Sequence, residues 1–148
     1  MLKLSRLTDY AVVILTIMEK QGDEPVSAAI VAEQSKLPEP TVAKILKLLA
    51  GNGLLNSIRG IKGGYILDKC LSEVSVKDVI TALDGPIALT ACVESATGGC
   101  DFAPQCGMFG RWDRVNRAMQ DALSSVSIAD MLADQNARTR LKELKESA

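Results

Sequence analysis

Residues 40–67 read PTVAKILKLLAGNGLLNSIRGIKGGYIL, and this stretch decides the fold. Its first part repeats apolar side chains at the i, i+3, i+4 and i+7 spacing of an amphipathic helix, at Val42, Ile45, Leu46 and Leu49. Pro40 suits the first turn of that helix, because a proline loses no hydrogen bond there. Two short apolar runs, 54–58 and 65–67, then flank a glycine-rich basic loop, which predicts a β-hairpin.

Two shorter helices are predicted before this stretch. The first runs from about Thr8 to Lys20, and the turn 21–25, which contains glycine and proline, ends it. The second begins after Ser27, a good N-cap residue, and runs to about Gln34. Three helices followed by a two-stranded hairpin make a winged helix-turn-helix. The sequence therefore predicts a mainly α-helical fold with a small β-hairpin wing.

The third helix and the hairpin have the chemistry of a DNA-binding surface. A recognition helix needs one apolar face for its own domain and one polar or basic face for the major groove. The polar face predicted here carries Thr41, Lys44 and Lys47. The hairpin tip carries Arg59 and Lys62 among glycines, and a guanidinium is favoured in a narrow minor groove. An ordinary solvated face beside an ordinary hairpin is the alternative, and the ordered combination of motifs favours DNA binding.

The second half contains another short helix, a cysteine-containing loop and a long helix. Ser75 caps the short helix, Gly85 and Pro86 end it, and residues 91–106 are a loop rich in small and polar residues. We expect the long helix at about 108–124. The chain then divides into a DNA-binding domain, a cluster-binding loop, a dimerisation helix with its return turn, and a charged tail expected to be disordered: 1–84, 85–107, 108–132 and 133–148.

The long helix carries an apolar stripe. Its members are Trp112, Val115, Met119 and either Leu123 or Ala122. A helix of this length in so small a protein often pairs with its copy across a two-fold axis. Packing within the chain explains the stripe equally well.

Composition excludes several classes of function. The chain has 148 residues with 17 basic and 18 acidic side chains, which suits one domain or one domain with an appended helix. It has no histidine, so it has no imidazole general base and no imidazole metal ligand, and we expect no enzyme. Residues 1–69 carry a net charge of +2, the sign expected if this half meets phosphates. The apolar run 11–18 is shorter than the roughly 20 residues that a bilayer requires, and we expect a cytoplasmic protein.

Three of the four cysteines, Cys92, Cys100 and Cys106, fall within fifteen residues. In a cytoplasmic protein such a group is more often metal-binding or redox-active than structural. Its gaps of seven and five residues are wider than those between paired ligands of common zinc sites. Thiolates in such a loop can hold an iron–sulfur cluster, and zinc or three unrelated thiols are the alternatives. We expect Cys70, which stands apart, to be a small core hydrophobe.

The motifs together resemble one family, the IscR/NsrR-type winged-helix transcription regulators. They are LKLSRLTDYAV at 2–12, RGIKGGYIL at 59–67, DGP at 84–86 and the three-cysteine loop. The resemblance covers about residues 1–132. The wide gap between Cys92 and Cys100 is most similar to the branch that regulates the SUF iron–sulfur cluster assembly operon.

This resemblance implies a homodimer that binds a pseudo-palindromic operator on double-stranded DNA, with the long helix as the dimer seam. The positions that match the family's three cluster ligands are Cys92, Cys100 and Cys106. Arg59 matches the wing arginine that enters the minor groove. The base-reading stretch corresponds to Pro40, Thr41 and Lys44, and it departs from the best-known member, so the operator sequence does not carry over.

The fourth cluster ligand is where the chain departs most from the family. One branch has a histidine shortly after the third cysteine, and Phe109 stands there in this chain. Another branch uses an aspartate in the first helix, which matches Asp9 and which the partner subunit could donate. Cys70 is the second candidate, and Glu94 and Asp113 follow. A helix N-terminal charge is the alternative role for Asp9. A carboxylate is a weak ligand for iron, so we expect a labile cluster.

The resemblance therefore implies a transcription regulator that senses iron–sulfur status through the three-cysteine loop and controls SUF genes. We expect a 2Fe–2S rather than a 4Fe–4S cluster. A nitric-oxide or redox-responsive iron–sulfur repressor of the same fold and a zinc- or thiol-based regulator are alternatives. A redox protein with a degenerate DNA-binding head is a further alternative from another class. Repression and activation are both compatible with the sequence.

Overall fold

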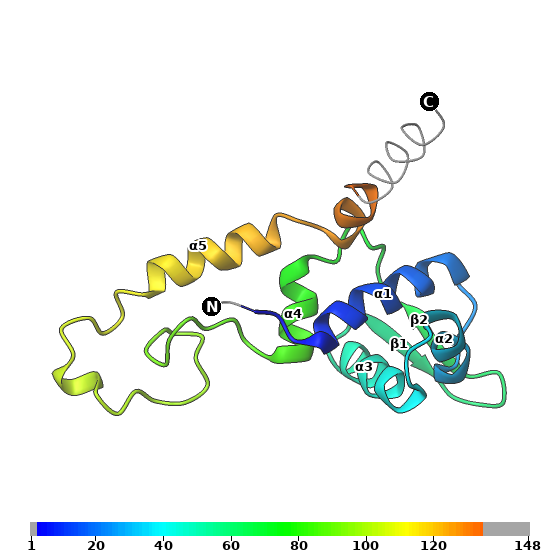
Figure 1. Cartoon of the computed structure of the whole chain (residues 1–148), viewed down its shortest axis with the longest axis horizontal. Helices are drawn as coiled ribbons and strands as arrows, with labels where there is room; N and C mark the ends of the chain where they lie inside the picture. The colour runs from blue at the N-terminus through cyan, green and yellow to red at the C-terminus, as the bar shows by residue number, and fades with distance from the viewer. Residues whose placement is uncertain (1–2, 135–148) are drawn as a thin grey trace.

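The protein, seen in a computed structural model that describes residues 3–134, is mainly helical and has one two-stranded sheet (Figure 1). Its elements are α1 (Arg6–Gln21), α2 (Ala28–Ser35), α3 (Glu39–Gly51), β1 (Leu55–Ile58), β2 (Gly64–Leu67), α4 (Val76–Asp84), a 3₁₀ turn (Ala103–Gln105) and α5 (Asp113–Ser124). The order of three helices and a hairpin confirms the predicted winged helix-turn-helix. From residue 135 on, the predicted charged tail lies outside the described residues. None of the described helices is long and apolar enough to cross a membrane.

Serine side chains begin three of the helices. Ser5 at α1 and Ser27 at α2 each accept a backbone N–H from the first helical turn. Ser75 at α4 forms a capping box with Asp78, in which each side chain accepts the other residue's backbone N–H. These contacts satisfy N–H groups that have no partner within a helix. The helix starts predicted from Ser27 and Ser75 are confirmed.

Helix α1 is the centre of the core and packs against α2, α3 and α4. It buries Ala11, Ile14 and Leu15 completely. The four apolar positions predicted on α3, from Val42 to Leu49, are also completely buried. Burying an aliphatic side chain of this size contributes about 1.5–3 kcal/mol to the free energy of folding. This face therefore holds α3 firmly against the rest of the N-terminal part of the chain before the Gly85–Pro86 pair, which we call the head.

The wing is attached to the head along both strands. β1 and β2 pair antiparallel, with Leu55 opposite Leu67. Tyr65 on β2 also exchanges two backbone hydrogen bonds with Val26, of 3.0 and 2.9 Å. A Cβ at Gly64 would lie 2.5 Å from the Val26 carbonyl oxygen, so this close approach requires glycine. The double glycine before Tyr65 therefore has a packing role at its second position.

Residues 85–125, which we call the arm, leave the head after α4 and return to it. At the return, the Val76 N–H donates to the Val126 carbonyl oxygen at 2.9 Å, and the Ile128 N–H donates to that of Val74 at 2.8 Å. Ile128 is completely buried. Figure 1 shows the arm, made of a long irregular loop and α5, extending to one side of the head. The arm is therefore tied to the head at both of its ends.

After the arm, Ser127 caps a last helical segment. Its hydroxyl accepts the backbone N–H of Asp130 at 3.0 Å, and the Asp130 carboxylate accepts the Ser127 N–H at 2.9 Å. Two hydrogen bonds from Ser127 hold the pKa of Asp130 below its ordinary value. The larger effect comes from the Ser127 backbone and the smaller one from its side chain. This charge lies in the first turn of a helix, where the dipole favours an anion.

Helix α5 is shorter than predicted. It begins at Asp113 rather than near Met108, and residues 107–112 form turns. Gly110 has a φ of +72°, a left-handed conformation that interrupts a right-handed helix. The predicted helix start was wrong because the apolar spacing continues through a segment whose glycines do not sustain a helix.

The side of α5 that faces the rest of the arm is polar. Asn116 is only 3% exposed. Its Oδ1 accepts the Leu89 N–H at 3.0 Å, and its Nδ2 donates to the Ile87 carbonyl oxygen at 3.1 Å and to Ser95 Oγ at 2.9 Å. Gln120, one turn later, donates to the same carbonyl at 3.1 Å. We call Asn116, Gln120 and Ser95 the amide latch, because they hold the start of the loop against α5.

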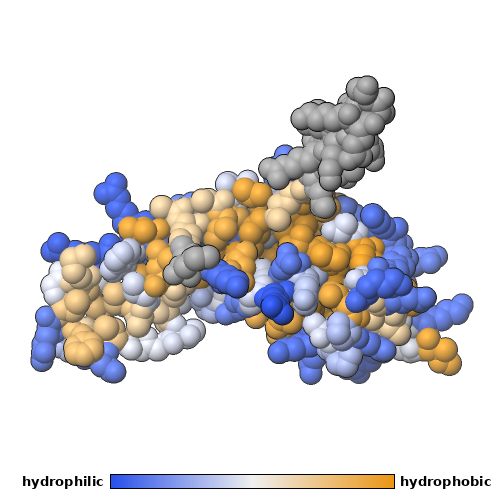
Figure 2. Space-filling view, viewed as in Figure 1, coloured by the Kyte–Doolittle hydropathy of each residue, from blue (hydrophilic) through white to orange (hydrophobic). Residues whose placement is uncertain are grey.

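The outward side of α5 combines exposed charges at Arg114, Arg117 and Asp121 with exposed apolar side chains. Val115 is 48% exposed and Trp112 is 41% exposed. Three large side chains of the neighbouring loop are exposed by half or more, namely Phe102, Met108 and Phe109. Met119 and Leu123 instead line a hollow against α4 and the start of α1. The predicted stripe is thus divided, and Figure 2 shows hydrophobic surface continuing along the arm.

The amide latch makes a prediction about stability. Asn116→Ala should lower the free energy of unfolding by about 1–3 kcal/mol, because it leaves buried backbone groups of the loop without partners. Urea denaturation at one protein concentration measures this. Arg117→Ala is the matched control on the same helix, since its ion pair with Glu94 is 3.8 Å long and both side chains are at least 70% exposed. Equal urea midpoints for the two variants would show that the latch does not stabilise the arm.

Candidate DNA-binding surface and cysteine loop

Helix α3 presents its predicted polar residues on the side opposite its core face. Pro40, Lys44 and Lys47 are exposed, and Thr41 is half-buried. Proline lies in the first turn, as predicted, and Glu39 adds one exposed carboxylate there. An exposed helix face with two lysines one turn apart can meet phosphates on either side of a groove. The structure therefore brings the four predicted residues of α3 together on one surface.

The tip of the wing is a closed turn rather than a loose loop. The Gly63 N–H donates to the Gly60 carbonyl oxygen at 3.0 Å. Gly60 has a φ of +116°, and a Cβ at Gly63 would collide with the backbone of Ile58. The predicted residues Arg59 and Lys62 are both exposed on this turn. The glycines thus allow the closed turn on which the two cations are presented.

One cation near this surface was missed by the sequence reasoning. Lys36 ends α2 and lies in the turn before α3, exposed, with a φ of +59°. It is the one non-glycine residue with positive φ among residues 3–134. Such a position normally favours glycine or asparagine. A lysine there adds positive charge beside the beginning of α3. Its position in the turn between two predicted helices could have identified it from the sequence as part of this surface.

The three predicted ligands on the loop are free thiols in different surroundings. Cys92 is half-buried, and its Sγ lies 3.1 Å from the hydroxyl of Thr90. Cys100 is half-buried, and Cys106 is exposed directly after the 3₁₀ turn. Cys92 lies within the segment that the amide latch holds, between Leu89 and Ser95. It is therefore the thiol most directly fixed to α5.

The loop cysteines do not form a closed ligand set. Within residues 3–134, no three cysteine, aspartate or glutamate side chains come together at a point that could hold a metal ion.

Cys70 lies outside the core, because its side chain is exposed and the next residue, Leu71, occupies the buried position. The prediction that Cys70 is a core hydrophobe was wrong. The turn after β2 faces solvent at Cys70 and turns inward one residue later.

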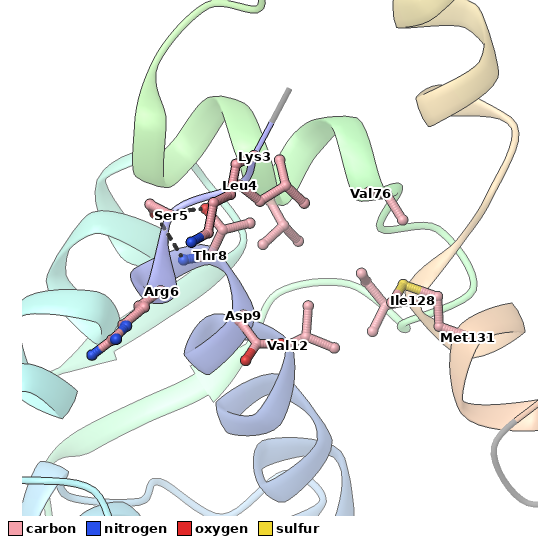
Figure 3. A pocket seen from close by; sticks show the side chains of 11 residues that line it. Lys3, Leu4, Ser5, Arg6, Thr8, Asp9, Val12, Val76, Ile128 and Met131 are labelled. Atoms are coloured by element: carbon pink, nitrogen blue, oxygen red, sulfur yellow. Dashed lines mark hydrogen bonds between the residues drawn. The ribbon is translucent and has the colours of Figure 1, made fainter. Parts of the chain in front are cut away.

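Asp9 lies beside a different cavity. This cavity, of about 360 Å³, lies between α1, α4 and the segment after the arm that carries Ile128 and Met131 (Figure 3). Val12, Val76 and Ile128 form its apolar wall, and Arg6 and Asp9 lie among the residues at its α1 side. The cysteines are not among its lining residues. Asp9 lies on α1 and the three loop cysteines lie in the arm, and within residues 3–134 no three such side chains converge on a metal site.

Two of the sequence motifs meet at the root of the arm. Thr8, which is 3% exposed, donates its hydroxyl hydrogen to Asp84 Oδ2 at 2.8 Å. The backbone N–H of Ser5 also points to this oxygen, at 3.4 Å. Asp84 is the last residue of α4 and precedes the Gly85–Pro86 pair. Hydrogen bonds therefore join the motif at 2–12 to the DGP motif at 84–86. They fix the start of α1 to the start of the arm.

Curated proteins and a family model resemble this chain over most of its length. The Rrf2 model, described as an iron-dependent transcriptional regulator, matches residues 4–134. The HTH-type transcriptional regulator IscR of Photorhabdus laumondii is 30% identical over 127 residues, which cover 85% of this chain and 76% of that protein. IscR of Klebsiella pneumoniae is 28% identical over 127 residues, with 85% and 77% covered.

Solved structures give the same result. CymR, the global cysteine regulator of B. subtilis, aligns with a TM-score of 0.63 at 28% identity and covers 90% of this chain and 98% of its own. T. potens IscR aligns with a TM-score of 0.59 at 30% identity, with 90% and 88% covered. These relatives are regulators and not enzymes, which confirms the predicted class and the resemblance to IscR-type proteins. The chain therefore belongs to the Rrf2 family and is a winged-helix transcription regulator.

Proposed function

We propose that the protein is a homodimeric regulator that acts in the cytoplasm, binds a pseudo-palindromic operator and senses iron–sulfur status to control SUF cluster-assembly genes. The observation that carries the DNA-binding part is the exposed basic face of α3 beside a wing whose glycines fix two cations at its tip. Its domains are the head at 1–84, the loop at 85–107 and the dimerisation segment at 108–132. Membership in a family of transcription regulators supports this proposal.

On DNA, α3 enters the major groove and the wing follows the adjacent minor groove. Pro40, Thr41 and Lys44 lie toward the beginning of α3, the end of a recognition helix that contacts base edges. Lys47, one turn later, pairs with a phosphate. Arg59 enters the minor groove, where narrow A·T-rich sequence concentrates negative potential. The polar α3 residues therefore read the operator, and the cations set affinity.

A second copy of the chain covers the outward face of α5. Val115 and Trp112 are about half exposed although the inner side of the same helix is polar. Exposed apolar side chains on a helix that have no partner among residues 3–134 are typical of a subunit interface. The two-fold axis of such a dimer would present two copies of α3 to the two half-sites of the operator.

The cysteine loop is the proposed sensor. Cys92, Cys100 and Cys106 supply three soft thiolate ligands, which suit iron, and Asp9 of the second subunit is the proposed fourth ligand. The donor set fits a cluster by its chemistry, and the present spacing of the thiols requires the loop to close around it. A bound 2Fe–2S cluster would supply a redox-sensitive and labile centre. The amide latch ties Cys92 to α5, so the loop's order and the dimer helix are linked.

A thiol-based regulator is the second candidate, and one observation favours it. All four cysteines are free, and among residues 3–134 they do not converge on a metal site. Oxidation of exposed Cys106 would then change the loop without a metal. This candidate shares the DNA-binding surface and differs only in the signal.

The DNA-binding surface predicts a specific salt dependence. Lys47→Ala removes two phosphate-pairing charges from a dimer, so the slope of log K against log salt should become less steep by about 2. Affinity at about 100 mM salt should fall by tenfold or more. Fluorescence anisotropy with a duplex selected by the wild-type protein from a random-sequence pool measures both. Lys77→Ala, on α4 and outside this surface, is the matched control and should leave the slope unchanged. Identical slopes for both variants would remove α3 from the interface.

The outward face of α5 predicts the oligomeric state. Val115→Glu should convert the dimer to monomers, because it places a charge in an apolar seam. Light scattering coupled to size-exclusion chromatography gives the mass directly. Arg114→Glu, on the same helix and equally exposed to solvent, should remain a dimer. A dimeric Val115→Glu variant would place the seam elsewhere.

The cysteine loop predicts a coloured protein that contains iron and sulfide. After anaerobic purification, Cys100→Ser should lose the visible absorbance and the iron, because it removes one of three thiolate ligands. Gln105→Ala, an exposed neighbour in the same loop, should keep both. Comparison of Asp9→Ala with Cys70→Ser then identifies the fourth ligand as the one whose loss makes the cluster more labile. A wild-type protein that is colourless and iron-free, and that changes its DNA affinity on thiol oxidation, would favour the second candidate.

A further inference from the structure

The most exposed hydrophobic side chain of the described residues lies at the tip of the wing. Ile61 has a relative exposure of 107%, whereas the next most exposed large hydrophobic residue, Phe102, has 75%. Figure 2 shows an isolated hydrophobic protrusion at the edge of the molecule where Figure 1 draws the tip between β1 and β2. Single exposed apolar residues are common on proteins. This one is distinguished by how it is held and by what surrounds it.

Ile61 lies in a hydrogen-bonded turn that requires glycine at its flanking positions. It is the second residue of the turn closed by the Gly63 N–H and the Gly60 carbonyl oxygen at 3.0 Å. The two glycines have conformations or contacts that a side chain would disrupt. The next glycine, Gly64, packs against Val26 in the head. The isoleucine is therefore presented at a defined position, and its χ1 is restricted because it is β-branched.

The charged residues of the wing around Ile61 are positive. Arg59 and Lys62 flank it, and residues 55–67 include no acidic residue. One carboxylate of the head, Glu24, lines the same open hollow as Ile61 and Lys62. An apolar group between two cations matches a nucleic-acid groove, in which phosphates accept the cations and the sugars and base edges accept the apolar group. A protein surface would have to combine an acidic rim with an apolar pocket to match it equally well.

We propose that Ile61 is a minor-groove contact, which packs against deoxyribose and base edges between the phosphates bound by Arg59 and Lys62. This rests on the proposed DNA binding by the wing and adds a part of it that does not depend on charge. Because van der Waals contact depends on groove width, Ile61 contributes to the choice of operator shape. The wing would thus combine one guanidinium in the groove with one aliphatic side chain.

The test uses variants that separate apolar contact from size and charge. Ile61→Asn and Ile61→Ala should each lower operator affinity by roughly tenfold per dimer, because they remove apolar surface from the interface. Neither should change the slope of log K against log salt, since no phosphate contact is lost. Ile61→Leu should bind like the wild-type protein. Lys62→Ala is the comparison from the same turn, and it should reduce the slope.

The measurement is anisotropy with the duplex selected by the wild-type protein, over a range of salt concentrations. Thermal unfolding of each variant should match that of the wild-type protein, because a fully exposed side chain makes no stabilising contact. Equal affinity of Ile61→Asn and the wild-type protein would overturn the proposal while leaving the proposed function intact. A wild-type protein without salt-dependent duplex binding would overturn the proposed function itself.

Discussion

A buried amide on α5 determines how the second half of the molecule is built. Asn116 is 3% exposed and uses both its oxygen and its nitrogen to bond the backbone of the preceding loop. Burying an amide without hydrogen-bond partners costs free energy of folding, so these bonds favour a loop from Ile87 to Ser95 that stays packed against α5. The same arrangement leaves Val115 of α5 exposed. One polar contact thus accounts for the position of the loop.

The arm is attached to the head at both of its ends. It begins at Asp84, whose carboxylate binds Thr8 of α1 at 2.8 Å, and it ends where Ile128 enters the core. Between these points, the amide latch joins the loop to α5, and Cys92 lies inside the joined segment. In the proposed function, chemistry at the cysteine loop would therefore act on a helix whose far end is fixed to the head. The loop after Cys92, with Cys100 and Cys106, has fewer such ties in the described residues and is the part free to close.

The head was predictable from the sequence because periodicity and capping agree there. Val42, Ile45, Leu46 and Leu49 are buried as the helical spacing requires, and Ser27 and Ser75 begin helices. The arm was less predictable, because its structure depends on contacts that leave no periodic signal. Nothing in the spacing identifies Asn116 as buried, and the apolar residues before α5 obscured the glycine at 110 that interrupts the helix. The meeting of Thr8 with Asp84 likewise joins two motifs that the sequence presents 76 residues apart. Candidate ligands could be named, but their assembly depends on loop closure and on a second chain.

The separation between cysteine loop and wing constrains how a signal could pass between them. The loop lies at the far end of the arm, and the wing tip lies at the opposite end of the head (Figure 1). In the proposed function, a change at the loop therefore acts on DNA through the relative position of the two heads of a dimer. Half-sites of an operator lie about 34 Å apart, one turn of the double helix, so both copies of α3 fit only at one spacing. A small rotation of one α5 against its copy would move both heads away from that spacing. In the proposed function, regulation therefore depends on how strongly the loop holds α5.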